Sequence, residues 1–418
     1  MKSNKLTQFI LGAMVLGIIF GYLINWYDAQ SGLSNQYVSY ISILTDVFLR
    51  LIKMIIAPLV FSTLAVGIAR MGDASTIGRV GLKTFSWFIS MSVVSLLLGL
   101  VMVNLLHPGT GLDLPLPEMT ASSTLNKNSL NLADFVKHIF PTSIIDAMGK
   151  NEILQIVVFA VFFGVATASF GERAHEFLRN LDMLSHIMLK ITTAVMKFAP
   201  VAVFAAVSAA IAENGLAILM TYGKFMLSFY AAILTLWVVL ILISSVVLKK
   251  RVFHLVSMLR QPILLAFTTA SSEAAYPKTL EQVERFGCSN KIASFVLPVG
   301  YSFNLDGSMM YCTFAALFIA QVYGIEMPLT QQLLMLLVLM ITSKGIAGVP
   351  RASLVVIAAT LSQFHLPEAG VLLILGVDHF LDMARSATNV LGNALATAVV
   401  SKWEGELKQQ TLQNTNAS

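Results

Sequence analysis

Five polar side chains inside one long apolar stretch are the residues of this sequence best suited to bind a ligand. They follow one another by steps of four, three, four and four residues: Asp378, Asp382, Arg385, Asn389 and Asn393. Such steps place all five on one face of an α-helix. The stretch itself, residues 369–400, is long and apolar enough to cross a bilayer.

Charges at membrane depth are costly, so they usually face the protein interior and mark a substrate or ion path. A carboxylate, a guanidinium and amides on one helix face suit a small zwitterionic ligand that carries an additional acid group. The alternative is a self-neutralising ion pair, Asp382 with Arg385, that locks two helices together. One pair does not explain a second aspartate and two asparagines, so the pattern favours ligand binding.

The composition indicates an all-α integral membrane protein. Of its 418 residues, 56% are hydrophobic and 12% are charged, whereas roughly a quarter of the residues of a soluble domain are charged. Several apolar runs exceed the roughly 20 residues that a spanning helix needs. The formal net charge of +5 comes from Lys and Arg between the apolar runs, where they report orientation and not nucleic-acid binding. The sequence contains no nucleophile–base set, phosphate loop or metal motif, so we do not expect an enzyme or a metal site beyond one for Na⁺.

The apolar runs predict eight transmembrane helices. Their expected ranges are residues 6–27, 41–70, 85–106, 153–170, 188–212, 225–248, 291–324 and 369–400. Pro200 should kink the fifth of them. Lys and Arg are concentrated at the N-terminus and after the second, fourth and sixth helices, which places both termini in the cytoplasm by the positive-inside rule.

Two further segments consist of short apolar halves, which are typical of re-entrant hairpins. The first has its tip at Thr268–Glu273, and the second has its tip at residues 343–351, where two glycines precede a proline. The helix at residues 291–324 is also interrupted, because Tyr301–Ser308 combines Gly with Asn and Asp at membrane depth. Each hairpin is followed by a helix with polar residues at its centre. This arrangement predicts inverted repeats, in which transporters bind substrate and ions.

Hairpin tips bring hydroxyls and backbone amides to the middle of the membrane. Ser271 and Ser272 could donate to a substrate carboxylate or cap a helix, and the two roles can coexist. Asn304 and Asp306 could supply oxygens to Na⁺, hold a proton, or merely form an Asx-turn at the helix break. Glu273 is a proton carrier if it is buried and an ordinary carboxylate if it reaches water.

The chain resembles the dicarboxylate/amino acid:cation symporter family, and most of all its bacterial glutamate/aspartate:proton symporters. Four motifs in order carry the resemblance, which covers essentially the whole chain: Ala270–Glu273, Asn304–Ser308, Gly345–Pro350 and Asp378–Asn393. The resemblance implies a glutamate-transporter-type fold, a homotrimer in the inner membrane, and a mobile domain that moves like an elevator. The implied scaffold is residues 6–70 and 150–215, and the implied transport domain is residues 80–106 and 222–405.

By the same resemblance, Asp382 would bind the amino group of the substrate and Arg385 its side-chain carboxylate. Asn389 and the Ser271–Ser272 tip would hold the α-carboxylate. The substrate site would be completed by Ser308, Gly348 and Ser386, and the coupling cation would be bound by Ser92, Asn304, Asp306, Asp378 and Asn393. Members for C4-dicarboxylates lack an acid at the position of Asp382, which favours an acidic amino acid over malate or succinate.

Three departures from the pattern of the family matter, and the first two concern its sodium-driven members. Those members tend to carry Asp where this chain has Asn393, and hydroxyl-bearing residues where it has Phe88 and Met91. Hard cations are bound by oxygen ligands, so their loss favours H⁺ as the coupling ion, with Na⁺ as the alternative. Arg351 is the third departure, and a basic side chain there could alter gating or substrate choice.

The sequence therefore predicts a secondary symporter for glutamate or aspartate, driven by H⁺ or Na⁺, with membrane lipid around it and no organic cofactor or nucleic-acid partner. A carrier for C4-dicarboxylates or cystine is the nearest alternative. An ion channel, whose pore a polar stripe could line, is a more distant one. The fixed Asp382–Arg385 pair suits a zwitterion better than a stream of one ion.

Overall fold

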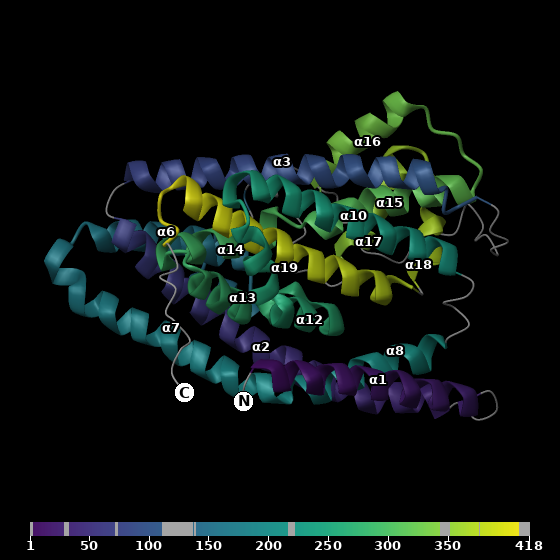
Figure 1. Ribbon diagram of the computed structural model, residues 1–418, viewed down its shortest axis with the longest axis horizontal. Helices are drawn as coiled ribbons and strands as arrows, with labels where there is room; N and C mark the ends of the chain where they lie inside the picture. The colour runs from purple at the N-terminus through teal and green to yellow at the C-terminus, as the bar shows by residue number, and fades with distance from the viewer. Residues whose placement is uncertain are drawn as a thin grey trace.

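The computed structural model describes residues 3–28, 33–71, 74–110, 137, 139–215, 222–342, 352–375 and 377–408, and this part of the chain is helical apart from its turns and one isolated bridge, Cys288 with Leu407 (Figure 1). Six of the described helices are long and apolar enough to cross a membrane, or seven if a bent pair forms one span. That pair is α11 (Arg251–Met258) and α12 (Arg260–Thr269). The structure thus confirms an all-helical protein with several apolar helices, and the total of eight crossings stays a prediction.

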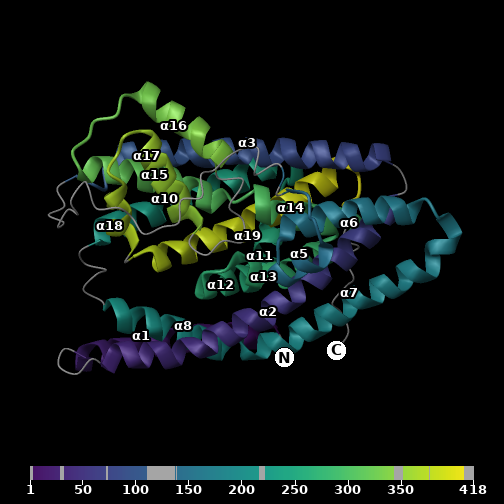
Figure 2. The ribbon, with the colours of Figure 1, turned by 180° about the vertical axis from the view of Figure 1, so that it is seen from behind.

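A first group of helices comes from the N-terminal half of the chain. It consists of α1 (Ser3–Asp28), α2 (Leu33–Met71), α6 (Ile153–Ala168), α7 (His175–Val195) and α8 (Ala199–Asn214). α8 lies along α1, and α2 packs against α6, α7 and α8. Figures 1 and 2 show α1, α2, α7 and α8 together along one edge of the molecule.

The helix type changes near Pro200, where the sequence predicts a kink. A 3₁₀ turn, η2 (Met196–Phe198), separates α7 from α8, and Pro200 lies in the first turn of α8. Proline is tolerated there because the first-turn N–H groups have no partner within the helix.

α3 (Ala74–Leu106) begins well before the predicted start at Phe85. Its first turns contain Arg79 and Lys83, which hydropathy assigns to a connection because charged residues do not belong in a bilayer core. Both are good helix formers, and both contact Glu404 just after the last turn of α19. The early part of α3 is therefore a helix stabilised by ion pairs.

The second group surrounds α19 (Asp378–Trp403), which packs against α10 (Gly223–Leu248), α12, α13 (Ser272–Phe286), α14 (Asn290–Phe303) and α15 (Asp306–Val322). Every residue from Met383 to Ser401 is buried. A helix that is buried all round lies at the centre of a large bundle, so this helix is the core of the second group.

The remaining helices are short or flank undescribed residues. They are α5 (Ile144–Lys150), η1 (Gly171–Ala174), α16 (Leu329–Thr342), α17 (Ala352–Gln363), η4 (Glu368–Gly370) and α18 (Val371–Leu375). α16 and α17 are the two halves expected on either side of the second tip, and the tip itself lies outside the described residues.

Three interruptions bear directly on the site, and the first two of them were predicted. α12 ends at Ala270, whose φ of 48° is left-handed, and Ser271 then caps α13. α14 and α15 are separated by Asn304 and Leu305. The helix predicted over residues 369–400 is divided, because α18 ends at Leu375 and α19 begins at Asp378. An aspartate is favoured in a first helical turn by the positive end of the helix dipole.

Candidate functional site

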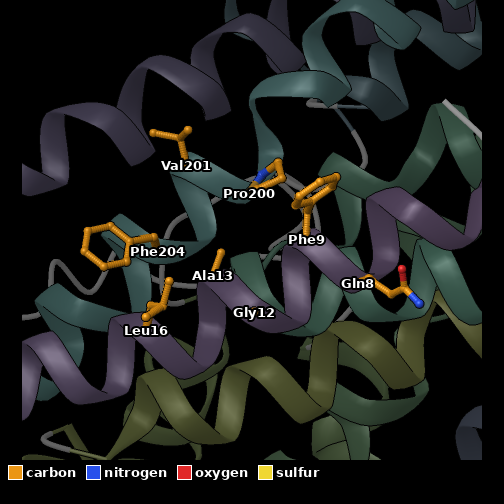
Figure 3. A pocket seen from close by; sticks show the side chains of 8 residues that line it. All are labelled: Gln8, Phe9, Gly12, Ala13, Leu16, Pro200, Val201 and Phe204. Carbon is orange, nitrogen blue, oxygen red and sulfur yellow. The ribbon is translucent and has the colours of Figure 1, made fainter.

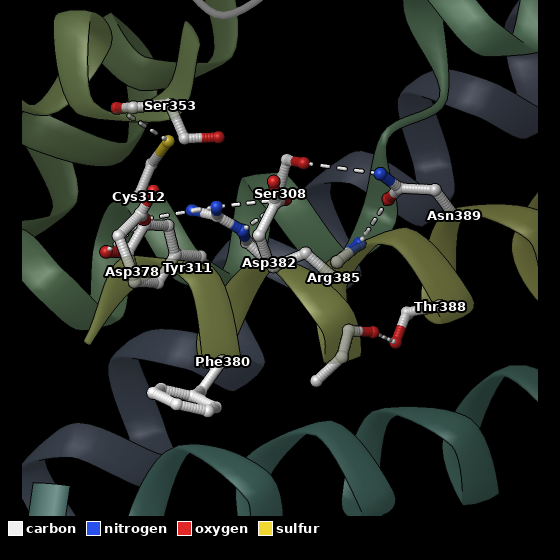
Figure 4. Close-up of polar contacts among 12 residues, drawn as sticks. Ser308, Tyr311, Cys312, Ser353, Asp378, Phe380, Asp382, Arg385, Thr388 and Asn389 are labelled. Atoms are coloured by element: carbon white, nitrogen blue, oxygen red, sulfur yellow. Dashed lines mark hydrogen bonds and ion pairs between the residues drawn. The ribbon is translucent and has the colours of Figure 1, made fainter. Parts of the chain in front are cut away.

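The charged half of the stripe on α19 is one connected cluster (Figure 4). Arg385 is buried, and its Nη2 lies 3.1 Å from Oδ1 of Asp378 and 2.9 Å from Oδ1 of Asp382. Nε of Arg385 also donates to Oδ1 of Asp382, at 3.1 Å. From α15, the Tyr311 hydroxyl donates to Oδ1 of Asp378 at 3.0 Å, and the Tyr311 ring lies 4.0 Å from Cζ of Arg385. Ring, hydroxyl and two carboxylates thus fix the guanidinium in place.

One side of this cluster is open to a ligand. The side chain of Asp382 is 35% exposed, whereas those of Asp378 and Arg385 are almost fully buried. Nη1 of Arg385 has no hydrogen-bond partner among the described residues. A buried donor without a partner is costly, so an incoming carboxylate that accepts from Nη1 would be stabilised. The half-exposed carboxylate of Asp382 beside it can accept a hydrogen bond from an ammonium group.

Asn389 connects the middle of the stripe to the first turn of α15. Its Oδ1 accepts from the backbone N–H of Gly307 at 2.9 Å, and its Nδ2 donates to Oγ of Ser308 at 3.3 Å. Ser308 and Asn389 are therefore neighbours, as the sequence predicts, and they lie next to the charged cluster in Figure 4.

Four fully buried side chains form a second cluster at the far end of the stripe. Nδ2 of Asn304 donates to Oδ2 of Asp306 at 3.1 Å and to Oδ1 of Asn393 at 3.2 Å. From α3, Oγ of Ser95 donates to Oδ1 of Asp306 at 3.4 Å. The side chain of Asn304 thus bonds to other side chains here, which is more than an Asx-turn would require.

This second cluster, called the amide cluster below, consists of Ser95, Asn304, Asp306 and Asn393. It contains one carboxylate and two polar atoms without a hydrogen-bond partner among the described residues. Oδ1 of Asn304 and Nδ2 of Asn393 have no hydrogen-bond partner in the described part of the chain. A buried carboxylate held mainly by neutral groups is costly unless a proton or a cation joins it. Asp306 with its amide and hydroxyl neighbours therefore suits one monovalent cation.

Two glycines make room for these side chains. A methyl group on Gly392 would overlap Oδ2 of Asp306, and one on Gly300 would overlap Oδ1 of Asn393. Any larger residue at either position would displace the amide cluster, so the helices can approach this closely only with glycine there.

At the tip of the first hairpin, Ser271 and Ser272 were predicted to contact a substrate carboxylate or to cap a helix. The Ser271 hydroxyl accepts from the backbone N–H of Ala274 at 3.3 Å, so this residue caps α13. No hydrogen bond joins Ser271 or Ser272 to the stripe within the described residues, although α12 and α13 pack against α19. Glu273 lies half-buried in the first turn of α13. The ligand and proton-carrier roles of these residues stay predictions.

Other predicted site residues have simpler placements. Ser92 is buried on α3 and Ser386 is buried on α19. Phe88 and Met91 are buried apolar side chains of α3. Gly348 and Arg351 lie outside the described residues.

Residues 6–403 match the model of the sodium:dicarboxylate symporter family. The chain belongs to this family. It is 39% identical to the proton/sodium-glutamate symport protein of Geobacillus stearothermophilus, over 98% of this chain and 97% of the relative. It is 41% identical to the proton/glutamate-aspartate symporter of Escherichia coli (strain K12), over 97% of this chain and 94% of the relative. It is also 38% identical to a C4-dicarboxylate transport protein of Geobacter sp. (strain M21), over 97% and 93% of the two chains.

Membership confirms the resemblance inferred from the four motifs. Together with the apolar helices, it identifies a multi-pass symporter of the inner membrane that takes a small-molecule substrate, and not an enzyme.

Sequence reasoning missed two residues of this symporter's site. Ser95 contacts Asp306, and Tyr311 contacts both Asp378 and Arg385. Each lies three residues after a residue that was predicted, Ser92 and Ser308 respectively, and residues three apart share a helix face. That spacing is the signal that could have found them.

A groove of about 390 Å³ lies elsewhere, between α1 and α8 (Figure 3). Its lining is apolar except for Gln8: Gln8, Phe9, Gly12, Ala13, Leu16, Pro200, Val201 and Phe204. A groove with no charged side chain cannot compensate a carboxylate or an ammonium group, so we do not assign the substrate to it.

Proposed function

We propose that this symporter imports acidic amino acids, glutamate or aspartate, together with H⁺, with Na⁺ as the alternative coupling ion. The observation that carries the proposal is the pairing of a buried guanidinium with a half-exposed carboxylate. Arg385 offers a free Nη1, and Asp382 lies beside it. The printed names of the relatives, glutamate and glutamate-aspartate symporters, support the same substrate class.

The geometry supports distinct roles for the groups of the substrate. A planar guanidinium can bind a carboxylate through two parallel hydrogen bonds, so Arg385 would bind the side-chain carboxylate. Asp382 would bind the ammonium group. Asn389 and Ser308, which are already hydrogen-bonded to each other, would bind the α-carboxylate together with Ser271, Ser272, Ser386 and Gly348.

Asp378 would hold Arg385 in place while the substrate comes and goes. It is buried and accepts from both Tyr311 and Arg385. Because Asp378 keeps the guanidinium oriented, Asp382 is free to move from Arg385 toward the substrate ammonium. Such preorganisation lowers the cost of binding.

The coupling ion would bind at the amide cluster. Asn304, Asp306, Asn393 and the nearby Ser92 and Ser95 supply carboxylate, amide and hydroxyl oxygens. A single carboxylate can be neutralised by one proton, whereas Na⁺ needs a shell of several oxygens. The replacement of a carboxylate by Asn393 therefore favours H⁺, and Glu273 at the hairpin tip is a second candidate proton carrier.

The proposed architecture has eight crossings and two re-entrant hairpins, with both termini in the cytoplasm. The scaffold would be residues 6–70 and 150–215, and the transport domain residues 80–106 and 222–405, in a homotrimer with elevator motion. The packing of α1 with α8 and of α2 with α6, α7 and α8, and that of α10, α12 and α15 with α19, supports this division, with α14 contacting both α2 and α19 at the boundary.

C4-dicarboxylates are a second candidate substrate class, because a relative of similar identity is named as their transport protein. A cystine carrier was the other alternative within the class. Asp382 argues against a dicarboxylate substrate. Its partly exposed carboxylate would repel the second acid group of such a substrate, and a dicarboxylate offers no ammonium group for Asp382 to bind.

Uptake into proteoliposomes tests the proposal. Radiolabelled glutamate, aspartate and succinate are offered separately, with H⁺ and Na⁺ gradients imposed one at a time. We expect glutamate and aspartate to accumulate when the outside is acidic and sodium is absent. Uptake that requires sodium would overturn proton coupling, and uptake of succinate alone would overturn the substrate class.

A further inference from the structure

Helix α10 holds α19 at two points through side-chain hydrogen bonds. The Tyr230 hydroxyl donates to the backbone carbonyl of Phe380 at 2.7 Å, and Nε1 of Trp237 donates to Oγ1 of Thr388 at 2.8 Å. Thr388 in turn donates to the carbonyl of Ala384 at 2.8 Å, so the indole bond reaches the backbone of α19. Among the hydrogen bonds of the described residues, none joins Tyr230, Trp237 or Thr388 to a side chain of the stripe.

The two bonds lie on either side of Asp382 and Arg385 along the helix axis. Phe380 precedes Asp382, and Thr388 follows Arg385. Their donors are seven residues apart on α10, about two helical turns, and their acceptors are about as far apart on α19. Two such attachment points, one above and one below, add to the packing around α19 and restrict its rotation about its own axis as well as its height. Loss of either bond would remove one of these restraints.

Rotation of α19 determines where the ligand groups point. Side chains extend about 5–6 Å from a helix axis, so a rotation of about 10° moves their tips by about 1 Å. A displacement of that size is enough to change substrate positioning markedly. Both donors come from a helix whose other face is apolar and exposed, including Leu234 and Val238, so their polar atoms have a specific use on this side.

We propose that Tyr230 and Trp237 are positioning residues that set the rotation of α19 and thereby the choice between aspartate and glutamate. The inference rests on the proposed function. The two amino acids carry the same charges but differ by one methylene in the distance between them. A turn of α19 moves Arg385 and Asp382 relative to Ser308, which lies on α15 across the bundle, and so it cannot suit both lengths equally.

A double-mutant cycle tests this inference. Trp237→Phe removes the donor and keeps a ring, Thr388→Val removes the acceptor and keeps the shape, and the double variant removes both. Binding of aspartate and of glutamate is measured by calorimetry on the purified full-length protein. We expect the ratio of the two dissociation constants to change by about three- to tenfold in each single variant. The double variant should show no further change, because the bond is already lost.

Further variants separate positioning from general damage. Thr388→Ser keeps an acceptor and should restore the wild-type ratio. Tyr230→Phe should shift the ratio independently. Thr235→Val is the matched control on α10, because its hydroxyl bonds only to Ala231 of the same helix among the described contacts, and it should leave the ratio unchanged. Thermal denaturation without substrate identifies any variant that fails to fold, and Tyr230→Phe then carries the test alone.

The outcomes are distinct. An unchanged ratio in folded Trp237→Phe and Tyr230→Phe, with normal binding by the wild type, overturns this inference and leaves the proposed function intact. Additive effects of Trp237→Phe and Thr388→Val overturn the role of their hydrogen bond. If the wild type binds neither amino acid, the proposed function fails and the inference fails with it.

Discussion

The two ends of the polar stripe on α19 are built on opposite electrostatic principles. At its beginning, the guanidinium of Arg385 lies within hydrogen-bond distance of the carboxylates of both Asp378 and Asp382, so the cluster is made of full charges. Toward its end, Asp306 bonds to Asn304 and Ser95, and Asn304 bonds in turn to Asn393, so the partners around this carboxylate are neutral. Both clusters are centred on α19, with Asn389 between them.

The difference follows from what each cluster has to bind. A substrate with fixed charges is best matched by fixed opposite charges, because unmatched ligands then leave a buried charge unpaired. A small cation brings only one charge, which a single carboxylate neutralises. Removing a charge from the first cluster should therefore change which substrate is bound, and adding a charge to the second should change which ion is bound. The following experiments test this, from the largest expected effect to the smallest.

Arg385→Cys should abolish uptake of acidic amino acids, with a loss of affinity of at least about 100-fold, and should admit neutral amino acids. The substitution leaves Asp378 and Asp382 without their shared cation, and removing one partner of a buried charge pair costs several kcal/mol. Competition binding with glutamate and serine measures both effects. Arg285→Cys, at a mostly exposed arginine, is the matched control. Glutamate bound with native affinity would remove Arg385 from the site.

Asp382→Asn should weaken binding of glutamate and aspartate by about 10- to 100-fold, because a charge-assisted bond to the ammonium group is lost. Binding of succinate should improve, since a repelling carboxylate has been removed. The ratio of succinate to aspartate inhibition constants is the measurement. Asp146→Asn, at an exposed position, controls for the change of charge. If succinate does not gain, the ammonium group is bound elsewhere.

Asn393→Asp should make uptake depend on sodium, by about tenfold between sodium-free and sodium-containing buffer. The new side chain has nearly the same shape but gives the amide cluster a second carboxylate, and two buried carboxylates need a cation more strongly than one does. Glutamate uptake at fixed pH, with choline replacing sodium as control, gives the answer. Equal uptake in both buffers would show that the ion does not bind at this cluster.

Glu404→Gln should have the smallest effect on transport, within about twofold, although it also removes an ion-paired carboxylate. Glu404 lies beyond the last turn of α19, where Oε2 is 3.0 Å from Nη2 of Arg79 and Oε1 is 2.7 Å from Nζ of Lys83. The Glu404 side chain is buried, but Arg79 and Lys83 are partly exposed, and ion pairs whose cations reach solvent are worth little, about 1 kcal/mol or less. A large loss of uptake would mean that charge anywhere along α19 matters, which would contradict the contrast between its two ends.

The same variant has a predictable dependence on pH. Burial alone would raise the pKa of the Glu404 carboxyl, but hydrogen bonds from Arg79 and Lys83 and their charges hold that pKa below its ordinary value of 4.5. The contribution of Glu404 to stability is therefore complete above the ordinary pKa and is lost as the pH falls through the lowered one. Wild type should melt at a slightly higher temperature than Glu404→Gln at pH 7, and the difference should vanish in acid.

Much of the site could be predicted from the sequence because it depends on local periodicity. The stripe from Asp378 to Asn393 needs only the 3.6-residue repeat of one helix. The break at Ser271 follows from an apolar run that is too short to span the membrane. The break at Asn304 follows from polar residues that interrupt a longer apolar run. The predicted start of α3 at Phe85 was wrong, because the helix begins at Ala74. Hydropathy finds the membrane-embedded part of a helix and not its charged extension.

The sequence by itself determined the class of protein, the order of its helices and which helix face carries the charges. Only the tertiary structure decided how those charges are used. Arg385 bonds to Asp378 as well as Asp382 because Tyr311 of α15 holds that aspartate, and Asn304 bonds to both Asp306 and Asn393 because Gly300 and Gly392 let the helices approach. Such contacts join residues far apart in the chain, and no local pattern specifies their distance. They depend instead on how buried helices pack, and packing is a property of the whole bundle.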